Sequence, residues 1–138
     1  MKVLVIFMLI AFAASAEVHA DAEKKDPIDV ALDKATEIDP STAGVVQATT
    51  DADGKWLKEI DRALSHLKKV MTAGQWKKLQ VSQGAWKTFR DKELAMQDAI
   101  FESKQGSMWV PVAATSGMEL DRERALLLRH YVDLVSEE

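Results

Sequence analysis

The chain has 138 residues and no cysteine, and its 18 basic and 22 acidic side chains give a formal net charge of −4. The absence of cysteine excludes disulfides, thiolate metal sites and cysteine nucleophiles. The mild acidity argues against nucleic acid as a partner and is compatible with a cationic protein partner.

The first twenty residues have the three zones of a secretory signal. Met1-Lys2 is a short basic start, residues 3–14 are an unbroken apolar run, and small residues follow in patterns that end at Ala16 and Ala20. The run is shorter than the roughly 20 residues that span a bilayer. We expect residues 1–20 to be a signal peptide, cleaved after Ala20 or Ala16, rather than the alternative of a buried helix.

Residues 21–138 are then expected to form one helical domain without a membrane anchor, in the periplasm or outside the cell. A short helix is predicted from Pro27 to about Ile38. Asp26 can cap it and Pro27 suits its first position, whereas Asp39-Pro40 disfavours its continuation.

A long amphipathic helix is predicted next, capped by Ser41 or Thr42. Its apolar side chains recur in steps of three and four over about seven turns. They are Val45, Ala48, Ala52, Trp56, Ile60, Ala63, Leu67 and Val70. Gly54 weakens this helix by about 1 kcal/mol.

Thr72 and Gln75 form a capping-box pattern that ends the second helix and begins a third. The predicted inward stripe of the third helix is interrupted by polar residues. It runs through Trp76, Leu79, Gln83, Trp86, Phe89 or Arg90, Glu93, Met96 and Ile100.

Residues 104–107 break the helical pattern, and Met108 to Pro111 are expected to form an extended apolar connection. Pro111 can begin the last helix. Its predicted stripe is Ala113, Gly117, Leu120, Arg124, Leu127, Tyr131 and Leu134. These elements and their short loops predict an all-α fold, a small antiparallel bundle of three long helices plus a short N-terminal helix.

Charges on an inward stripe are costly unless they are paired. Arg124 is therefore expected to meet Glu93 or Asp91 on the antiparallel third helix. Two interpretations stay open, an internal polar network or a polar floor below a partner-binding groove with residues 106–109 at its rim. The candidate residues are Gln83, Trp86, Arg90, Asp91, Glu93, Gly106, Ser107, Trp109 and Arg124.

No catalytic, cofactor-binding or metal-binding pattern is found in the sequence. His66 and His130 have no second histidine at helical spacing, and Asp51 and Asp53 lack the further ligands of a Ca²⁺ loop. Phosphate-loop and nucleophile motifs are absent as well. The sequence therefore predicts a protein that is not an enzyme and needs no cofactor.

One motif run covers the third and fourth predicted helices. It reads Gln83-x-Ala85-Trp86-x-x-Phe89-Arg90-Asp91-x-Glu93, then Gly106-Ser107, then Arg124-Ala125-x-x-Leu128. This run resembles the LprI-like lysozyme inhibitor family of bacterial envelope proteins. The resemblance implies a helical envelope domain that blocks lysozyme in some relatives. Relatives commonly carry cysteine where this chain has Leu94, so packing would replace a disulfide here.

Three functions follow as hypotheses. The first is an inhibitor that binds a cationic lysozyme-type peptidoglycan hydrolase and plugs its two-carboxylate cleft with a loop such as Lys104 to Pro111. The second is an immunity or adaptor protein for another envelope enzyme or toxin. The third is a small enzyme or ligand carrier, which requires an enclosed pocket lined by Arg90, Asp91 or Arg124.

Overall fold

The computed structural model describes residues 25–137, which form helices and no strand. The helices are α1 (Pro27–Ile38), α2 (Thr42–Val70), α3 (Ala73–Glu102) and α4 (Trp109–Ser136). The all-α prediction is confirmed for this part of the chain. The predicted signal peptide lies outside the described residues. None of these four helices combines the length and hydropathy needed to cross a membrane.

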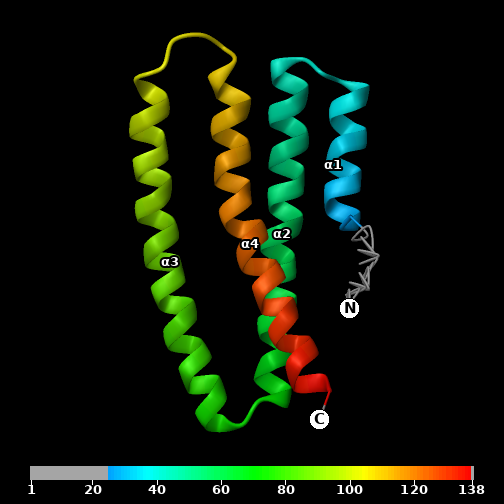
Figure 1. Cartoon of the computed structure of the whole chain (residues 1–138), viewed down its shortest axis with the longest axis vertical. Helices are drawn as coiled ribbons and strands as arrows, with labels where there is room; N and C mark the ends of the chain where they lie inside the picture. Colours follow the sequence, from blue (N-terminus) through cyan, green and yellow to red (C-terminus); the bar gives the residue numbers. More distant parts are fainter. Residues whose placement is uncertain (1–24, 138) are drawn as a thin grey trace, which may run out of the picture.

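The helices lie side by side in the spatial order α3, α4, α2, α1 (Figure 1). α4 packs along α2, α1 packs on α2, and α3 packs on α4. The α1–α2 and α3–α4 turns lie at one end of the molecule, and the α2–α3 turn lies at the other. α3 therefore has α4 as its main neighbour and stands apart from α2.

The predicted beginnings of the first three helices are confirmed by their caps. The side chain of Asp26 accepts a hydrogen bond from the backbone N–H of Ile28 at 2.8 Å, and Ser41 Oγ accepts one from Gly44 at 3.0 Å. Thr72 and Gln75 form the reciprocal capping box, with bonds of 3.3 and 2.8 Å. Each cap satisfies backbone donors that the helix leaves free.

The predicted extended connection before the last helix is wrong. α4 begins at Trp109, and Met108 has helical dihedral angles (φ −61°, ψ −23°). Pro111 occupies the third position of the helix, where its missing N–H would have had no intrahelical partner anyway. The reversal of direction takes place at Gly106, whose φ of 100° is a conformation that L side chains rarely adopt.

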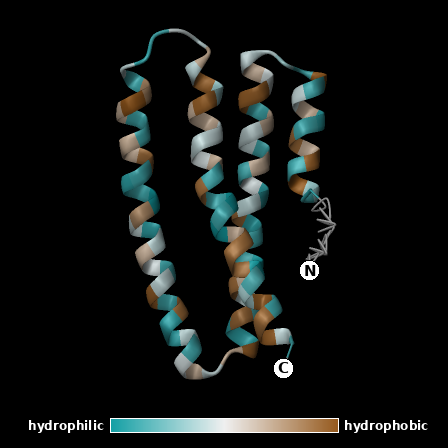
Figure 2. Ribbon diagram, in the orientation of Figure 1, coloured by the Kyte–Doolittle hydropathy of each residue, from teal (hydrophilic) through white to brown (hydrophobic). Residues whose placement is uncertain are grey.

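The core lies between α2 and α4. Trp56 and Leu67 of α2 and Ala125 and Leu128 of α4 have no exposed surface. The predicted α2 stripe is confirmed from Ala48 to Leu67, which all lie in the buried set. In Figure 2, hydrophobic segments concentrate where α2 and α4 lie together.

The predicted inward stripe of the last helix is wrong by a rotation of the helix. Leu127 and Leu134 are exposed, whereas the buried residues are Met118, Asp121, Arg124, Ala125 and Leu128. The predicted stripe did not include Asp121, which is a polar residue. Asp121 is in fact the inward residue between Met118 and Ala125, because an arginine from α3 neutralises it.

The C-terminal part of the predicted α3 stripe is also wrong. Leu79 and Gln83 are buried, but Met96 and Ile100 are exposed. The alternative of Phe89 or Arg90 is decided in favour of Arg90, which faces inward while Phe89 is exposed. Because α3 has one main neighbour, it buries only a narrow strip of its surface.

Candidate functional site

Arg90 and Asp121 form the central polar contact between α3 and α4. Arg90 Nε and a terminal nitrogen of its guanidinium donate to the two carboxylate oxygens of Asp121 at 2.5 and 2.6 Å. Asp121 has no exposed side-chain surface, while Arg90 is about one-quarter exposed. This hydrogen bonding raises the pKa of Arg90, against the opposing effect of burial. The pair therefore fixes α3 against α4 as a charged, two-pronged contact.

A cleft of about 330 Å³ opens above this pair, where α3 stands apart from α2. Asp53 of α2 reaches into the same region, and one of its carboxylate oxygens is buried without a hydrogen-bond partner. Burial first, and then the neighbouring carboxylate of Asp121, raise the pKa of Asp53 to about 6, although the charge of Arg90 opposes the rise. Residues lining the cleft are Thr49, Thr50, Asp53, Arg90, Leu94, Asp98, Ala113, Ala114, Gly117 and Met118.

Arg124 is the second inward arginine of the hairpin formed by α3 and α4. Its Nε donates to the side-chain oxygen of Gln83 at 2.9 Å, and its guanidinium lies 5.7 Å from the ring centroid of Trp86. A longer bond of 3.4 Å reaches Ser82 Oγ. Burial lowers the pKa of Arg124. Three predicted site residues, Gln83, Trp86 and Arg124, therefore come together.

The expected pairing of Arg124 with Glu93 or Asp91 is wrong. Asp91 is exposed, because it follows Arg90 by one position and is rotated by about 100° away from α4. Glu93 is half-buried and makes no salt bridge with any other residue from 25 to 137. Arg124 instead bonds to the side-chain amide of Gln83, which is neutral, so this contact is not an ion pair.

The turn between α3 and α4 projects at one end of the molecule (Figure 1). Gly106 and Ser107 are exposed within it, as are Lys104 and Met108. Trp109 is half-buried, because its ring packs against Phe101 with 6.4 Å between centroids. Lys104 Nζ lies 5.2 Å from the Trp109 ring centroid, and the lysine side chain stays exposed. The tryptophan thus stiffens the turn instead of projecting from it.

A second polar cluster joins α1, α2 and α4. Arg122 donates to both oxygens of Asp29 at 2.7–3.1 Å, and Arg129 donates to Glu59 at 2.7 and 3.0 Å and also bonds to Asp26. Both guanidiniums lie near the ring of the fully buried Trp56, at 5.6 and 5.3 Å from its centroid. The two arginines are seven residues apart, which places them on one face of α4. Sequence reasoning missed this cluster, and that spacing is the signal from which it could have been predicted.

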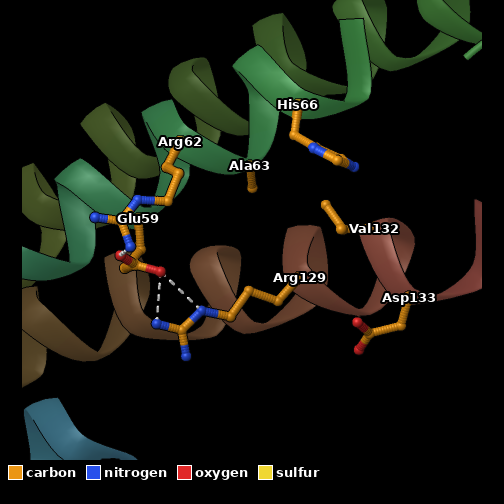
Figure 3. Close-up of a pocket in the computed structure, with 7 residues that line it drawn as sticks. All are labelled: Glu59, Arg62, Ala63, His66, Arg129, Val132 and Asp133. Carbon is orange, nitrogen blue, oxygen red and sulfur yellow. Dashed lines mark hydrogen bonds and ion pairs between the residues drawn. The ribbon is translucent and has the colours of Figure 1, made fainter. Parts of the chain in front are cut away.

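A groove of about 310 Å³ borders the second cluster (Figure 3). Figure 3 shows the Glu59–Arg129 contact at one end and His66 near Val132 at the other. Ala63 and Val132 give the groove an apolar floor. Among residues 25–137, no three histidine, aspartate or glutamate side chains gather in a way that could hold a metal ion.

Of the predicted site residues, four belong to the internal network and three to the projecting turn, whereas Asp91 and Glu93 belong to neither. The network has Gln83, Trp86, Arg90 and Arg124, and the turn has Gly106, Ser107 and Trp109. Arg90, Asp91 and Arg124 line no common enclosed pocket, since one is paired with Asp121, one is exposed and one is bonded to Gln83. Sequence reasoning missed Asp53 and Asp121. The available signal for Asp121 was its position three residues after Met118 and four before Ala125.

Comparison with known proteins gives a matching family and a similar solved structure. Residues 33–128 match the model of the family described as "Lysozyme inhibitor LprI". The crystal structure of an uncharacterized protein from Burkholderia thailandensis is similar, with a TM-score of 0.76 and 34% sequence identity. The match covers 82% of this chain and 57% of that one, so this chain spans little more than half of the solved protein. No curated protein matches the sequence.

Proposed function

Because the chain belongs to the LprI lysozyme-inhibitor family, we propose that it binds and blocks a lysozyme-type peptidoglycan hydrolase. The observation that carries this proposal is the family match over residues 33–128. Export fits it, with residues 1–20 as a signal peptide and residues 21–138 as the inhibitor in the periplasm or outside the cell. An inhibitor needs a rigid binding surface and no catalytic group of its own.

The projecting turn and the first residues of α4, together residues 104–111, are the proposed contact with the hydrolase. Lysozymes work through two carboxylates in a cleft. The cationic Lys104 would face these carboxylates, and the exposed Met108 would cover apolar surface beside them. The Phe101–Trp109 packing holds the turn in one conformation, which reduces the entropy lost on binding.

The polar network below the turn has a positioning role in this proposal. The Arg90–Asp121 pair and the Arg124–Gln83 bond hold α3 against α4, which sets the direction in which the turn projects. Gly106 and Ser107 shape the turn itself. The net charge of −4 would steer the protein towards a cationic lysozyme.

The first prediction tests both the function and the contact. Purified protein is added to lysozymes of several structural types, and the clearing of a peptidoglycan suspension is followed. We expect micromolar protein to slow at least one enzyme. Lys104→Glu should weaken inhibition about tenfold or more, equivalent to about 1.4 kcal/mol, because it places a third carboxylate against two others.

Lys68→Glu is the matched control, since it makes the same charge change on an exposed lysine near the far end of α2. It should inhibit nearly as well as the unmodified protein. Loss of the same size in both variants would show that the turn is not the contact. Failure to slow any lysozyme would contradict the proposed function and favour a different envelope partner.

A further inference from the structure

The cleft above the Arg90–Asp121 pair carries two further carboxylates, those of Asp53 of α2 and Asp98 of α3. Neither of them forms a salt bridge with any other residue from 25 to 137. Arg90 and Asp121 neutralise each other. The cleft therefore holds two negative charges without a counter-ion, and Asp53 is partly buried.

A buried hydroxyl in the same cleft also lacks a partner. Thr49 lines the cleft and is 2% exposed, and it lies one turn before Asp53 on the same face of α2. The hydroxyl of Thr50 donates to the backbone oxygen of Val46 at 2.8 Å, but that of Thr49 makes no hydrogen bond with any residue from 25 to 137. Buried polar groups are nearly always hydrogen-bonded. An unpaired hydroxyl next to an unpaired carboxylate indicates that a donor belongs in this cleft.

The remaining lining of the cleft suits an aliphatic chain. Its volume of about 330 Å³ is within the range of small-molecule sites, roughly 300–1,000 Å³. One carboxylate oxygen of Asp53 is buried, so only the other can face a ligand. A guanidinium pairs best with both oxygens, whereas a compact ammonium needs only one and has three donors. The apolar walls are Leu94, Ala113, Ala114, Gly117 and Met118.

We propose that this cleft binds a primary alkylammonium group, and that in the inhibitor complex this group is the side chain of a lysine of the hydrolase. The ammonium would donate to Asp53 and to the Thr49 hydroxyl, with the exposed Asp98 attracting it from the mouth of the cleft. Its aliphatic stem would lie along Leu94 and Met118. The assignment to a lysine rests on the proposed function, whereas the ammonium site does not.

The cleft lies close enough to the projecting turn to share one interface with it. Both are near the end of the molecule that carries the α1–α2 and α3–α4 turns (Figure 1). Gly117 in the cleft is six residues beyond Pro111, where the proposed contact ends, which is about 9 Å along α4. A standard interface covers about 800 Å² per partner. One hydrolase could therefore cover the turn and place a lysine in the cleft.

Binding of an ammonium group should depend on the ionisation of Asp53. The charged groups around this carboxyl are Arg90 and Asp98 of α3 and Asp121 of α4. Because the pKa of Asp53 is raised to about 6, its carboxyl is mostly protonated at pH 5 and then attracts no cation. The ionised fraction falls from nearly all at pH 7.5 to about one-tenth at pH 5. Affinity for an alkylammonium should therefore fall by up to about tenfold between these pH values.

Titration with n-butylammonium at pH 7.5, followed by the amide chemical shifts of the protein, tests the site. We expect saturable binding with a dissociation constant of about 1–10 mM, and at least about tenfold weaker binding of the neutral 1-butanol. Asp53→Asn should raise the dissociation constant about tenfold or more, and Thr49→Val about threefold. Asp51→Asn is the matched control, since it removes an exposed carboxylate from the same helix, and it should bind like the unmodified protein.

Absence of saturable binding, or equal binding by Asp53→Asn and Asp51→Asn, overturns the ammonium site. Equal binding of n-butylammonium and 1-butanol overturns it as well, because the cleft would then be selecting the apolar chain alone. Affinity that does not fall between pH 7.5 and 5 overturns the role of Asp53 as the counter-ion.

Lysozyme inhibition at pH 7.5 tests the assignment to a lysine. Asp53→Asn should weaken inhibition about tenfold, and Asp51→Asn should leave it unchanged. If n-butylammonium binds but Asp53→Asn inhibits as well as the unmodified protein, the lysine assignment is overturned and the cleft serves another amine. If no lysozyme is slowed, the lysine assignment fails with the proposed function, while the titration still decides the ammonium site.

Discussion

Asp53 and Asp121 bring two carboxyl groups together beside the single guanidinium of Arg90. The arginine bonds Asp121, so the carboxyl of Asp53 is left in a partly buried place with a negative neighbour. Its pKa therefore rises from an ordinary 3.8 to about 6. Since the folded chain holds this proton more tightly than the unfolded chain, the contribution to stability is full below pH 4. It is lost as the pH rises towards 6.

Asp53→Asn should therefore stabilise the protein at pH 7, by about 1–2 kcal/mol once solvent screening is allowed for. The gain should shrink as the pH falls from 6 towards 4, because the aspartate of the folded chain then becomes protonated. Urea unfolding at several pH values between 4 and 7 measures both effects. Asp98→Asn, on an exposed carboxylate of the same cleft, is the control and should have little effect. A less stable Asp53→Asn at pH 7 would show that the charge is needed.

At the scale of the helices, local sequence determines the ends more surely than the faces. Asp26, Ser41 and the Thr72–Gln75 pair each act on backbone groups two or three residues away. Such contacts form whatever the rest of the chain does, so the first three helices begin where predicted. The inward face of a helix depends on its neighbours, and the predicted inward face is wrong for α4 and for the C-terminal half of α3.

Two glycines of α2 should respond in opposite ways to alanine. Gly54→Ala should stabilise the protein by about 0.5–1 kcal/mol, because the added Cβ meets nothing within 4 Å and alanine favours a helix. Gly44→Ala should destabilise it by about 1–3 kcal/mol, because its Cβ would lie 2.5 Å from the backbone oxygen of Asp39. Thermal unfolding compares them, and equal signs would contradict the close approach at the α1–α2 turn.

At the scale of the molecule, α4 joins the parts together. It forms the core with α2, and its arginines Arg122 and Arg129 bind acids of α1 and α2. It holds α3 through Asp121 and Arg124. The attachment of α3 therefore depends on a few polar contacts as well as on a narrow apolar strip.

Arg90→Met should destabilise the protein by about 3–5 kcal/mol, because it leaves the fully buried Asp121 without its partner. Adding Asp121→Leu should recover most of the loss. Urea unfolding gives the free energies of unfolding. In Arg90→Met, amide hydrogen exchange should become faster in α3 while α2 is still protected. Arg62→Met, at a largely exposed arginine paired with Glu59, should change stability by less than about 1 kcal/mol. A similar small effect for Arg90→Met would show that the pair does not hold α3.

The sequence by itself determined the helices, most of their ends, the α2 face of the core and the motif run of the family. These features depend on residues close together in the chain. Only the tertiary structure decided that Arg124 meets Gln83, that Arg90 meets Asp121 and that Trp109 packs on Phe101. The two polar contacts join residues 41 and 31 positions apart, so they depend on how far α4 slides and turns against α3. Periodicity within one helix carries no information on that register, because the register is set by the packing of both helices at once.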